Sequence, residues 1–194
     1  MRFWYALAYV LCRLVFAIPY PMRYIGRENI PEGAVIVCAN HSRSLDPFLV
    51  AFALKLRRYP KFMAKKELFE TPALRWALTH IGVFPVDRGN MDLNATRTAI
   101  KYLKSGEIIM IFPEGTRVSP DESVAAKTGA IKLAEKHGVP ILPIGLPLEA
   151  KPLRRGKVII GKPYYIPPGK RTAADYQALS DELMQEIYNL RQEA

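Results

Sequence analysis

Short hydrophobic runs alternate with longer amphipathic stretches along most of the chain. Compact apolar runs predict buried strands at 34–40, 61–65, 82–87, 107–112, 139–146 and 157–163. The stretches between and after them, bounded by proline, glycine and capping residues, predict helices at 47–56, 72–80, 92–104, 123–138 and 172–193. This alternation predicts a single α/β domain whose mostly parallel or mixed sheet of about seven strands is flanked by helices.

Two of these helices carry a further expectation about their surfaces. In 92–104, Leu93, Thr96, Ile100 and Leu103 share one face, which we expect to pack against the sheet. The helix at 172–193 is rich in polar residues, so we expect it to be exposed.

The first twenty residues, MRFWYALAYVLCRLVFAIPY, are the most apolar stretch of the chain. They are too few to span a bilayer, Arg13 interrupts them, and no small-residue cleavage site follows. On a helix, Arg2 and Arg13 would lie about 20° apart with Tyr9 between them. We expect residues 1–22 to form an amphipathic helix in a membrane interface and 23–194 to form the main domain. The alternative is a helix packed on the core with its polar stripe exposed.

Charge and cysteine content narrow the classes of function. The 28 Lys and Arg residues exceed the 18 Asp and Glu residues, and the resulting charge of +10 calls for an anionic partner. The aromatic residues gather in the N-terminal segment and not between basic residues, which argues against nucleic-acid binding. Cys12 and Cys38 are the only cysteines, which favours neither a disulfide framework nor a zinc site.

The basic residues form two clusters in the sequence. Each cluster is a candidate for binding an anionic membrane or an acidic substrate or protein, and a solvated surface is the alternative. The first consists of Lys55, Arg57, Arg58, Lys61, Lys65 and Lys66, and the second of Lys151, Arg154, Arg155 and Lys157.

The stretch NHSRSLDP (40–47) contains a candidate base. On a continuous helix, His41 and Asp46 would point about 140° apart. They can meet if His41 lies in a loop and Asp46 caps the helix that Pro47 begins, which would fix the imidazole tautomer. From this stretch alone, an ordinary aspartate N-cap beside an unrelated histidine is the favoured interpretation.

No protein nucleophile accompanies this candidate base. The chain lacks a GxSxG elbow around Ser42 or Ser44, and Cys38 lies inside a predicted strand. A base without such a partner suggests that it activates a substrate hydroxyl directly. That chemistry requires a second substrate that is already activated, for example a thioester.

Two arginines follow predicted strands and are candidates for binding a phosphate. Arg117 ends FPEGTR (112–117), and Arg88 follows FPVD (84–87). Sites in α/β proteins gather at the carboxyl ends of strands, and a guanidinium can bind phosphate with two hydrogen bonds. A simple surface charge remains the alternative for each arginine.

Together these residues resemble the lysophosphatidate acyltransferases of phospholipid synthesis, within the glycerolipid acyltransferase superfamily. The chain shows four of that family's blocks in order over about residues 25–165. The blocks are His41 to Asp46, FPVDR ending at Arg88, FPEGTR at 112–117, and a strand with Pro140 and Pro143. MAKKEL (63–68) and KTGA (127–130) are secondary similarities. One departure is Arg43, where many family members carry serine.

The resemblance implies roles for the candidate site residues. His41 would take the proton from the free glycerol hydroxyl of a lysophospholipid while Asp46 orients it. Arg88 and Arg117 would hold the acceptor's phosphate. The other residues assigned to the phosphate pocket are Glu114, Gly115 and Thr116, and Lys65 and Arg43 are candidates for contacts with the donor or headgroup. The resemblance implies no metal and no other cofactor.

The resemblance also implies the substrates and location. The donor would be acyl-CoA or acyl-acyl-carrier protein, the product phosphatidate, and the location the cytoplasmic face of the cell membrane, with 23–194 as the acyltransferase domain. The alternatives are acylation of another lysophospholipid or of glycerol 3-phosphate, or a non-enzymatic basic protein that binds membranes.

Overall fold

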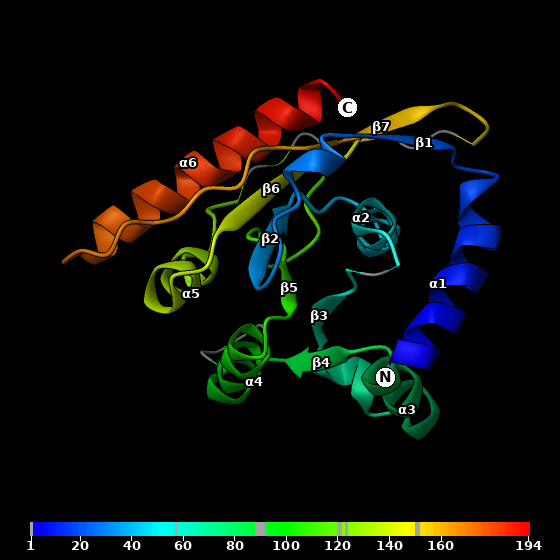
Figure 1. Ribbon diagram of the computed structural model, residues 1–194, viewed down its shortest axis with the longest axis horizontal. Helices are drawn as coiled ribbons and strands as arrows, with labels where there is room; N and C mark the ends of the chain where they lie inside the picture. The colour runs from blue at the N-terminus through cyan, green and yellow to red at the C-terminus, as the bar shows by residue number, and fades with distance from the viewer. Residues whose placement is uncertain (1, 57, 88–91, 120–121, 123, 150–151) are drawn as a thin grey trace.

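Among the residues described, seven strands form one sheet in the spatial order β1-β7-β6-β2-β5-β3-β4 (Figure 1). The structure is a computed structural model that describes residues 2–56, 58–87, 92–119, 122, 124–149 and 152–194. The strands are β1 (Met22–Ile25), β2 (Val35–Ala39), β3 (Pro60–Lys65), β4 (Val83–Val86), β5 (Ile108–Ile111), β6 (Ile141–Gly145) and β7 (Gly156–Ile160). Every neighbouring pair is parallel except β6 and β7, so the predicted α/β class with a mostly parallel sheet is confirmed.

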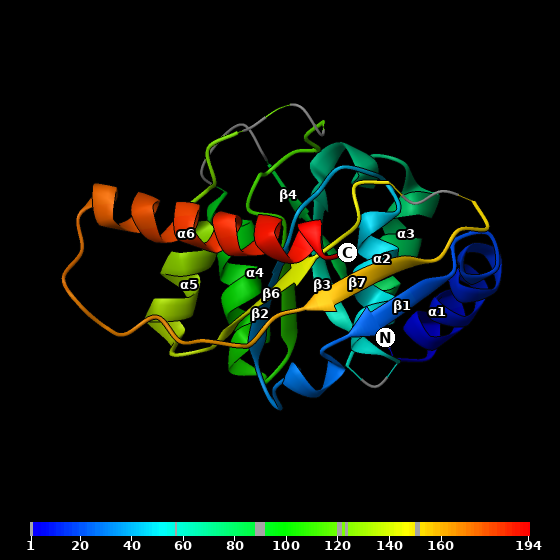
Figure 2. The ribbon, with the colours of Figure 1, turned by 90° about the horizontal axis from the view of Figure 1, so that it is seen from above.

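Helices cover both faces of this sheet. They are α1 (Arg2–Ala17), α2 (Asp46–Leu54), α3 (Pro72–His80), α4 (Leu93–Lys104), α5 (Gly129–His137) and α6 (Ala173–Gln192), with short 3-10 helices η1 (Arg27–Asn29) and η2 (Lys66–Phe69). Helices α4, α5 and α6 pack on one face and α2 on the other, with α1 outside α2 (Figures 1 and 2). The side chains of β2 alternate between these two cores, as strand geometry requires.

The face predicted to be apolar in α4 is only partly the buried one, with Leu103 in common. Leu93 is 58% exposed, whereas Ala95, Ala99 and Leu103 are buried. These three residues are spaced four apart and therefore form one row. The small alanine side chains in that row let the helix approach the sheet closely. The prediction relied on larger side chains and therefore overlooked them.

Helix α5 is shorter than expected. It begins at Gly129 and not at 123, and residues 124–127 form no helix. The N–H of Lys127 donates to the carbonyl of Pro113 at 2.8 Å, and Gln177 of α6 donates to the carbonyl of Ala126 at 3.0 Å. These bonds hold the segment as a loop against the turn that follows β5.

Helix α6 is not simply exposed. It buries Ser180, Leu183, Met184 and Ile187 against the sheet. A Cβ on Gly145 of β6 would lie 2.4 Å from the backbone of Leu190, so α6 crosses β6 at a point where only glycine fits.

The strand β1, which the sequence pattern did not reveal, pairs with β7 at the opposite edge from β4.

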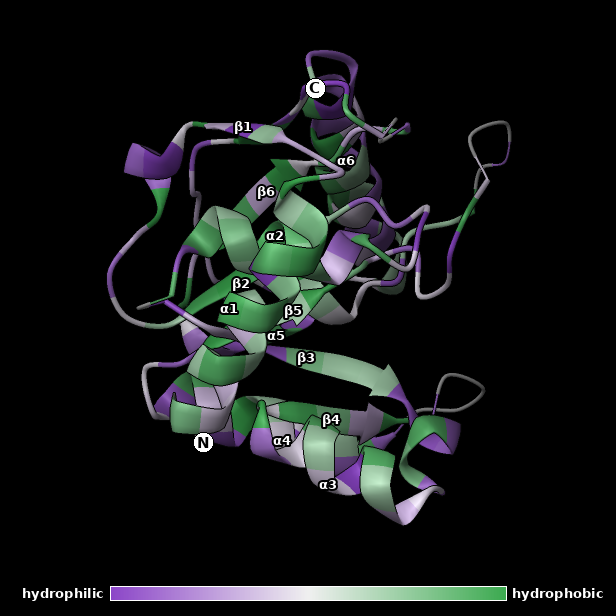
Figure 3. Ribbon diagram, turned by 90° about the vertical axis from the view of Figure 1, so that its right-hand side faces the viewer, coloured by the Kyte–Doolittle hydropathy of each residue, from purple (hydrophilic) through white to green (hydrophobic). Residues whose placement is uncertain are grey.

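Helix α1 packs through its tyrosines and turns its apolar side outward. Tyr5 is buried, with its ring centroid 4.5 Å from that of Tyr59, and the ring of Tyr9 lies 5.3 Å from that of Phe52 in α2. Six large apolar residues of α1, and Ile18 directly after it, are at least two-fifths exposed; the six are Phe3, Leu7, Val10, Leu11, Leu14 and Val15. Figure 3, seen from this side, shows α1 as largely hydrophobic at the front of the molecule.

The predicted polar stripe of α1 is therefore only partly outward. Tyr9 faces the body, Arg13 stays exposed with its guanidinium carbon 5.9 Å from the ring centroid of Phe52, and the side chain of Arg2 lies outside the described part. Helix α1 does pack on the body of the protein through Tyr5 and Tyr9, as the alternative expected, but most of its outward face is apolar. Within the described residues, no helix has the length and apolar character needed to cross a membrane.

Candidate active site

The HxxxxD loop and the FPEGTR turn meet at one edge of the sheet. His41 follows β2, and Phe112 to Arg117 follow the neighbouring parallel strand β5. Parallel strands end at the same edge, so the two segments emerge side by side. The N–H of Val118 donates to the carbonyl of His41 at 2.8 Å and joins them.

The side chains of His41 and Asp46 are in contact, with Nδ1 3.0 Å from Oδ2. Both residues are buried, at 7% and 2% exposure. An ionised carboxylate can only accept, so the proton of a neutral imidazole belongs on Nδ1 and Nε2 is left as the acceptor. The fold-back that the sequence suggested is present, and it provides the geometry of a general base with its orienting group.

Asp46 reaches this position differently from the expectation. It is the first residue of α2, whose N-cap is Leu45, and it does not cap the helix. Its Oδ2 instead accepts the backbone N–H groups of Ser42 and Arg43, each at 2.7 Å. The carboxylate satisfies donors of the loop, so one side chain holds both the imidazole and the backbone that carries it.

Two further contacts fix the imidazole ring and its backbone. The ring stacks on Phe112, with centroids 4.0 Å apart and planes inclined by 18°. The backbone N–H of His41 donates to Oε2 of Glu114 at 2.6 Å, and Oε1 accepts the hydroxyl of Tyr188 at 3.0 Å. Burial raises the pKa of Glu114, and the bonds from His41 and Tyr188 oppose that rise. Each carboxylate oxygen of Glu114 therefore accepts a hydrogen bond from a protein group, and the side chain supports the loop that carries His41.

The remaining residues of the turn face outward. Gly115 has a φ of +72°, and a Cβ there would lie 2.6 Å from the side chain of Lys127, so this turn needs glycine. Thr116 and Arg117 are exposed, and Nη1 of Arg117 donates to Oγ of Ser44 at 2.7 Å. Arg117 therefore lies directly over the HxxxxD loop.

The other predicted contact residues are only partly brought together. Arg88 lies outside the described residues. Lys65 is exposed, with Nζ 3.4 Å from Glu67. Arg43 is half-buried and donates to the carbonyl of Pro147 at 3.3 Å, which connects the loop to the segment after β6.

Two cavities meet at His41. The α1 cavity, of about 500 Å³, is walled mainly by apolar side chains of α1, α2 and β3 and also reaches Ser44, Lys65 and Arg117. The α5 cavity, of about 640 Å³, lies between α4 and the start of α5 and includes Lys127 and Thr128. His41, Met63 and Phe112 line both, so the imidazole stands where the two spaces join.

The first basic cluster is not a continuous surface. Lys61 is 1% exposed, with Nζ 3.7 Å from the ring centroid of Tyr59 and 3.8 Å from Glu107. Arg58 donates to the backbone carbonyls of residues 31 and 33, and Arg57 lies outside the described residues. Of the second cluster, Lys151 is not described, while Arg154, Arg155 and Lys157 are exposed.

Two residues that support the site were not predicted from the sequence. Tyr188 is 74 positions from Glu114, and no motif marks it. Asn40 precedes His41 and exchanges two hydrogen bonds with the backbone of Leu146, at 2.8 and 3.1 Å, which ties the loop to the end of β6. In the sequence, the signal that could have identified Asn40 was its position directly before His41. Within the described part of the chain, no group of three or more His, Cys, Asp and Glu side chains could hold a metal ion.

Comparison with known proteins identifies the class. Residues 21–146 match the family model described as Acyltransferase. The chain is 35% identical over 184 residues to the 1-acyl-sn-glycerol-3-phosphate acyltransferase of Bacillus subtilis (strain 168), covering 88% of this chain and 90% of that protein. The chain therefore belongs to the acyltransferase family, and the resemblance to the lysophosphatidate acyltransferases is confirmed.

A further relative and a solved structure are also similar to the chain. The 1-acyl-sn-glycerol-3-phosphate acyltransferase of Pseudomonas aeruginosa is 32% identical over 145 residues, which cover 73% of this chain and 54% of the relative. A crystal structure of the 1-acyl-sn-glycerophosphate (LPA) acyltransferase of Thermotoga maritima has a TM-score of 0.61 at 24% identity, covering 98% of this chain and 78% of that one. The latter likeness supports the fold.

Proposed function

We propose that this enzyme transfers a fatty acyl group from an acyl thioester to the free glycerol hydroxyl of lysophosphatidate, giving phosphatidate. The observation that carries the proposal is the buried His41–Asp46 pair at the junction of two cavities. The named activity of the relatives supports the same reaction.

In the proposed mechanism, Nε2 of His41 accepts the proton of the glycerol hydroxyl. The hydroxyl oxygen attacks the thioester carbonyl carbon, the carbon–sulfur bond breaks, and the imidazolium returns its proton to the departing thiolate. Asp46 stabilises the imidazolium and keeps the ring oriented. General-base assistance of this kind contributes about 10²–10⁴-fold to the rate. The acyl group passes directly between the substrates, because no protein nucleophile is needed.

The α1 cavity suits the acceptor. Its apolar walls would take the acyl chain, while Arg117 and Lys65 at the same cavity supply cations for the phosphate. The α5 cavity, which meets it at His41, is left for the acyl thioester. This arrangement brings hydroxyl and thioester together at the imidazole.

The outward apolar face of α1 supports a position at the membrane surface. A lipid acceptor could then enter the α1 cavity, which α1 itself lines, without crossing water. Residues 1–22 would serve as the peripheral membrane element on the cytoplasmic face, and 23–194 as the acyltransferase domain. The reaction as written uses acyl-CoA or acyl-acyl-carrier protein as co-substrate and requires no metal or other cofactor.

An acceptor panel tests this function. Purified protein is incubated with lysophosphatidate, other lysophospholipids or glycerol 3-phosphate, each with acyl-CoA and with acyl-acyl-carrier protein, and the lipid product is identified by mass. Phosphatidate should form fastest, and His41→Ala should suppress it. Faster acylation of another acceptor would replace lysophosphatidate as the substrate.

A further inference from the structure

The turn before β7 holds an exposed hydrophobic residue in an unfavourable backbone conformation. Leu153 is 79% exposed, and its φ of +61° lies in the left-handed region that leucine rarely adopts. Burial does not compensate for this conformation, so the turn presents the leucine outward at a cost in stability. We call residues 152–155 the Leu153 turn.

Two backbone hydrogen bonds attach the Leu153 turn to the segment that follows α1. The N–H of Leu153 donates to the carbonyl of Pro19 at 2.7 Å, and the N–H of Gly156 donates to that of Pro21 at 3.1 Å. Ile18, next to Pro19, is 72% exposed. Figure 1 shows the turn before β7 beside the C-terminal end of α1. The apolar face of α1 therefore continues onto Leu153.

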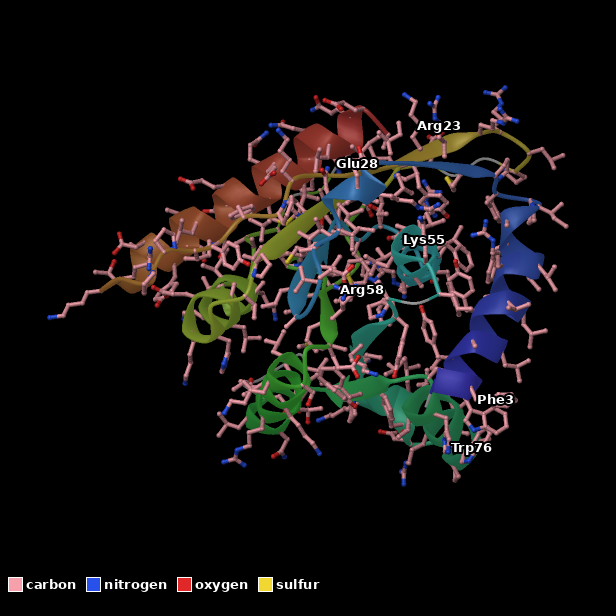
Figure 4. All side chains as sticks on the ribbon, in the orientation of Figure 1. Phe3, Arg23, Glu28, Lys55, Arg58 and Trp76 are labelled. Atoms are coloured by element: carbon pink, nitrogen blue, oxygen red, sulfur yellow. The ribbon has the colours of Figure 1, made fainter. Side chains whose placement is uncertain are left out.

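The same apolar surface extends past the other end of α1. The ring of Trp4 lies 5.0 Å from that of Trp76 in α3, and Trp76 is half exposed. Figure 4 shows Phe3 and Trp76 close together at this end. The apolar surface thus runs along the whole of α1, which is about 24 Å long at 1.5 Å per residue. It reaches α3 at the N-terminal end of the helix and the Leu153 turn at the C-terminal end.

Basic residues border the Leu153 end of this surface. Arg154 and Arg155 are exposed directly after Leu153, and exposed Arg23 of β1 is the register partner of Lys157 (Figure 4). Residues 146–157 contain four basic residues and a single acidic one, Glu149. An apolar tip flanked by arginines matches a membrane interface, where the acyl region accepts leucine and the phosphates accept guanidinium groups.

We propose that the Leu153 turn is a second contact with an anionic phospholipid bilayer, in addition to α1. A single interfacial helix can lift either end from the bilayer, whereas a second contact at the C-terminal end of α1 holds that end down. The turn would therefore keep the α1 cavity in one orientation relative to the bilayer. An acidic protein would satisfy the arginines but not a leucine continuous with the apolar face of α1. The inference rests on the proposed function in that the acceptor is a membrane lipid.

Leu153→Asn separates this role from a structural one. Asparagine tolerates the left-handed region, so the full-length variant should melt at or above the wild-type temperature. Its partition onto vesicles of three parts phosphatidylcholine to one part phosphatidylglycerol should nevertheless fall about tenfold, because the inserted leucine is lost. Leu93→Asn, at an exposed leucine on α4, is the matched control and should leave partition unchanged.

The double variant Arg154→Gln/Arg155→Gln tests the choice of lipid. Partition onto the anionic vesicles should fall about fivefold per charge removed, with no change on pure phosphatidylcholine. Wild-type partition in both this variant and Leu153→Asn overturns the proposal. Unchanged vesicle binding with weakened binding of acyl carrier protein would assign the turn to a protein partner and also overturn it.

A soluble substrate keeps this proposal distinct from the proposed function. Transfer to a short-chain, water-soluble lysophosphatidate should be equal in the wild type and in both turn variants. If the wild type acylates no lysophosphatidate, the proposed function fails, while the vesicle comparison still decides the role of the Leu153 turn.

Discussion

The hydroxyl of Tyr188 in α6 donates a hydrogen bond to the buried carboxylate of Glu114, 3.0 Å away. The other oxygen of that carboxylate accepts the backbone N–H of His41 at 2.6 Å. Arg191, whose guanidinium lies 4.3 Å from the Tyr188 ring centroid, also helps to lower the pKa of Glu114 against the effect of burial. The C-terminal helix is thereby connected to the loop that carries the proposed base, although α6 lies outside the family match at 21–146.

Tyr188→Phe should weaken this connection in a pH-dependent way. The change removes a hydrogen bond to the ionised carboxylate, so the pKa of Glu114 should rise further. The free energy of unfolding should fall by about 1.5–3 kcal/mol at pH values above that pKa. Because the lost bond favours the charged form, the deficit should shrink as the pH falls through the pKa of Glu114. Urea unfolding of both proteins over a pH series measures this.

The exposed tyrosine Tyr165 provides the control, and Tyr165→Phe should leave stability and turnover unchanged. We expect kcat to fall in Tyr188→Phe, since the backbone of His41 is less firmly held. A stability deficit independent of pH would show that Tyr188 contributes packing alone.

The sequence predicted those features that depend on local patterns. Buried runs located six of the seven strands, and the spacing of His41 and Asp46 with Pro47 suggested that the chain folds back. The contact of Tyr188 with Glu114 joins residues 74 positions apart, and nothing local distinguishes that tyrosine from the others. Such long-range contacts follow from how α6 crosses β6, which a single sequence does not specify.

The clustering of basic residues in the sequence was also a poor predictor of a basic surface. Lys61 lies within a run of basic residues in the sequence, yet its side chain is buried beside Tyr59 and Tyr102. The run is divided between elements, because Lys55 follows α2, Lys61 and Lys65 belong to β3, and Lys66 begins η2. Lys65, the last residue of β3, and Lys66, the first of η2, contact different acidic residues, Glu67 and Asp87 respectively.

Asp46→Asn should reduce kcat by about 10²–10⁴-fold while the protein remains folded. The asparagine keeps the shape but loses the charge that stabilises the imidazolium, and it can present an N–H to His41. Circular dichroism checks the fold, and single-turnover acyl transfer measures the rate. Ser42→Ala should retain activity, because no step uses its hydroxyl. Near-normal turnover in Asp46→Asn would remove the aspartate from the mechanism.

Arg117→Ala should act mainly on the acceptor. Loss of a charge-assisted contact with the phosphate should cost about 2–3 kcal/mol in kcat/KM for lysophosphatidate. The KM for the acyl thioester should change little, and Arg97→Ala, at an exposed arginine on α4, should match the wild type. Kinetics with each substrate varied in turn decide the matter, and an effect confined to the thioester would place Arg117 in the donor site.

The outward face of α1 is best tested by substitution, because deleting the helix would remove buried Tyr5 from the core. Leu11→Gln/Leu14→Gln changes two residues that are 53% and 63% exposed and keeps good helix formers. Vesicle co-sedimentation should fall by at least about tenfold, since two apolar side chains no longer insert. Transfer to a bilayer-embedded acceptor should fall with it, and transfer to a short-chain soluble acceptor should not. Retained vesicle binding would assign α1 a purely structural role.

Cys12 can report occupancy of the α1 cavity, because it lines that cavity while Cys38 is fully buried. Burial raises the pKa of Cys12, so alkylation by iodoacetamide should be slow at neutral pH and accelerate as the pH rises toward that pKa. If the acceptor's acyl chain fills the cavity, lysophosphatidate at ten times its dissociation constant should slow alkylation about tenfold. Glycerol 3-phosphate has the phosphate without the chain and should not protect, and Cys12→Ser should abolish the labelling. Unimpeded labelling at a lysophosphatidate concentration that saturates turnover would place the chain outside the α1 cavity.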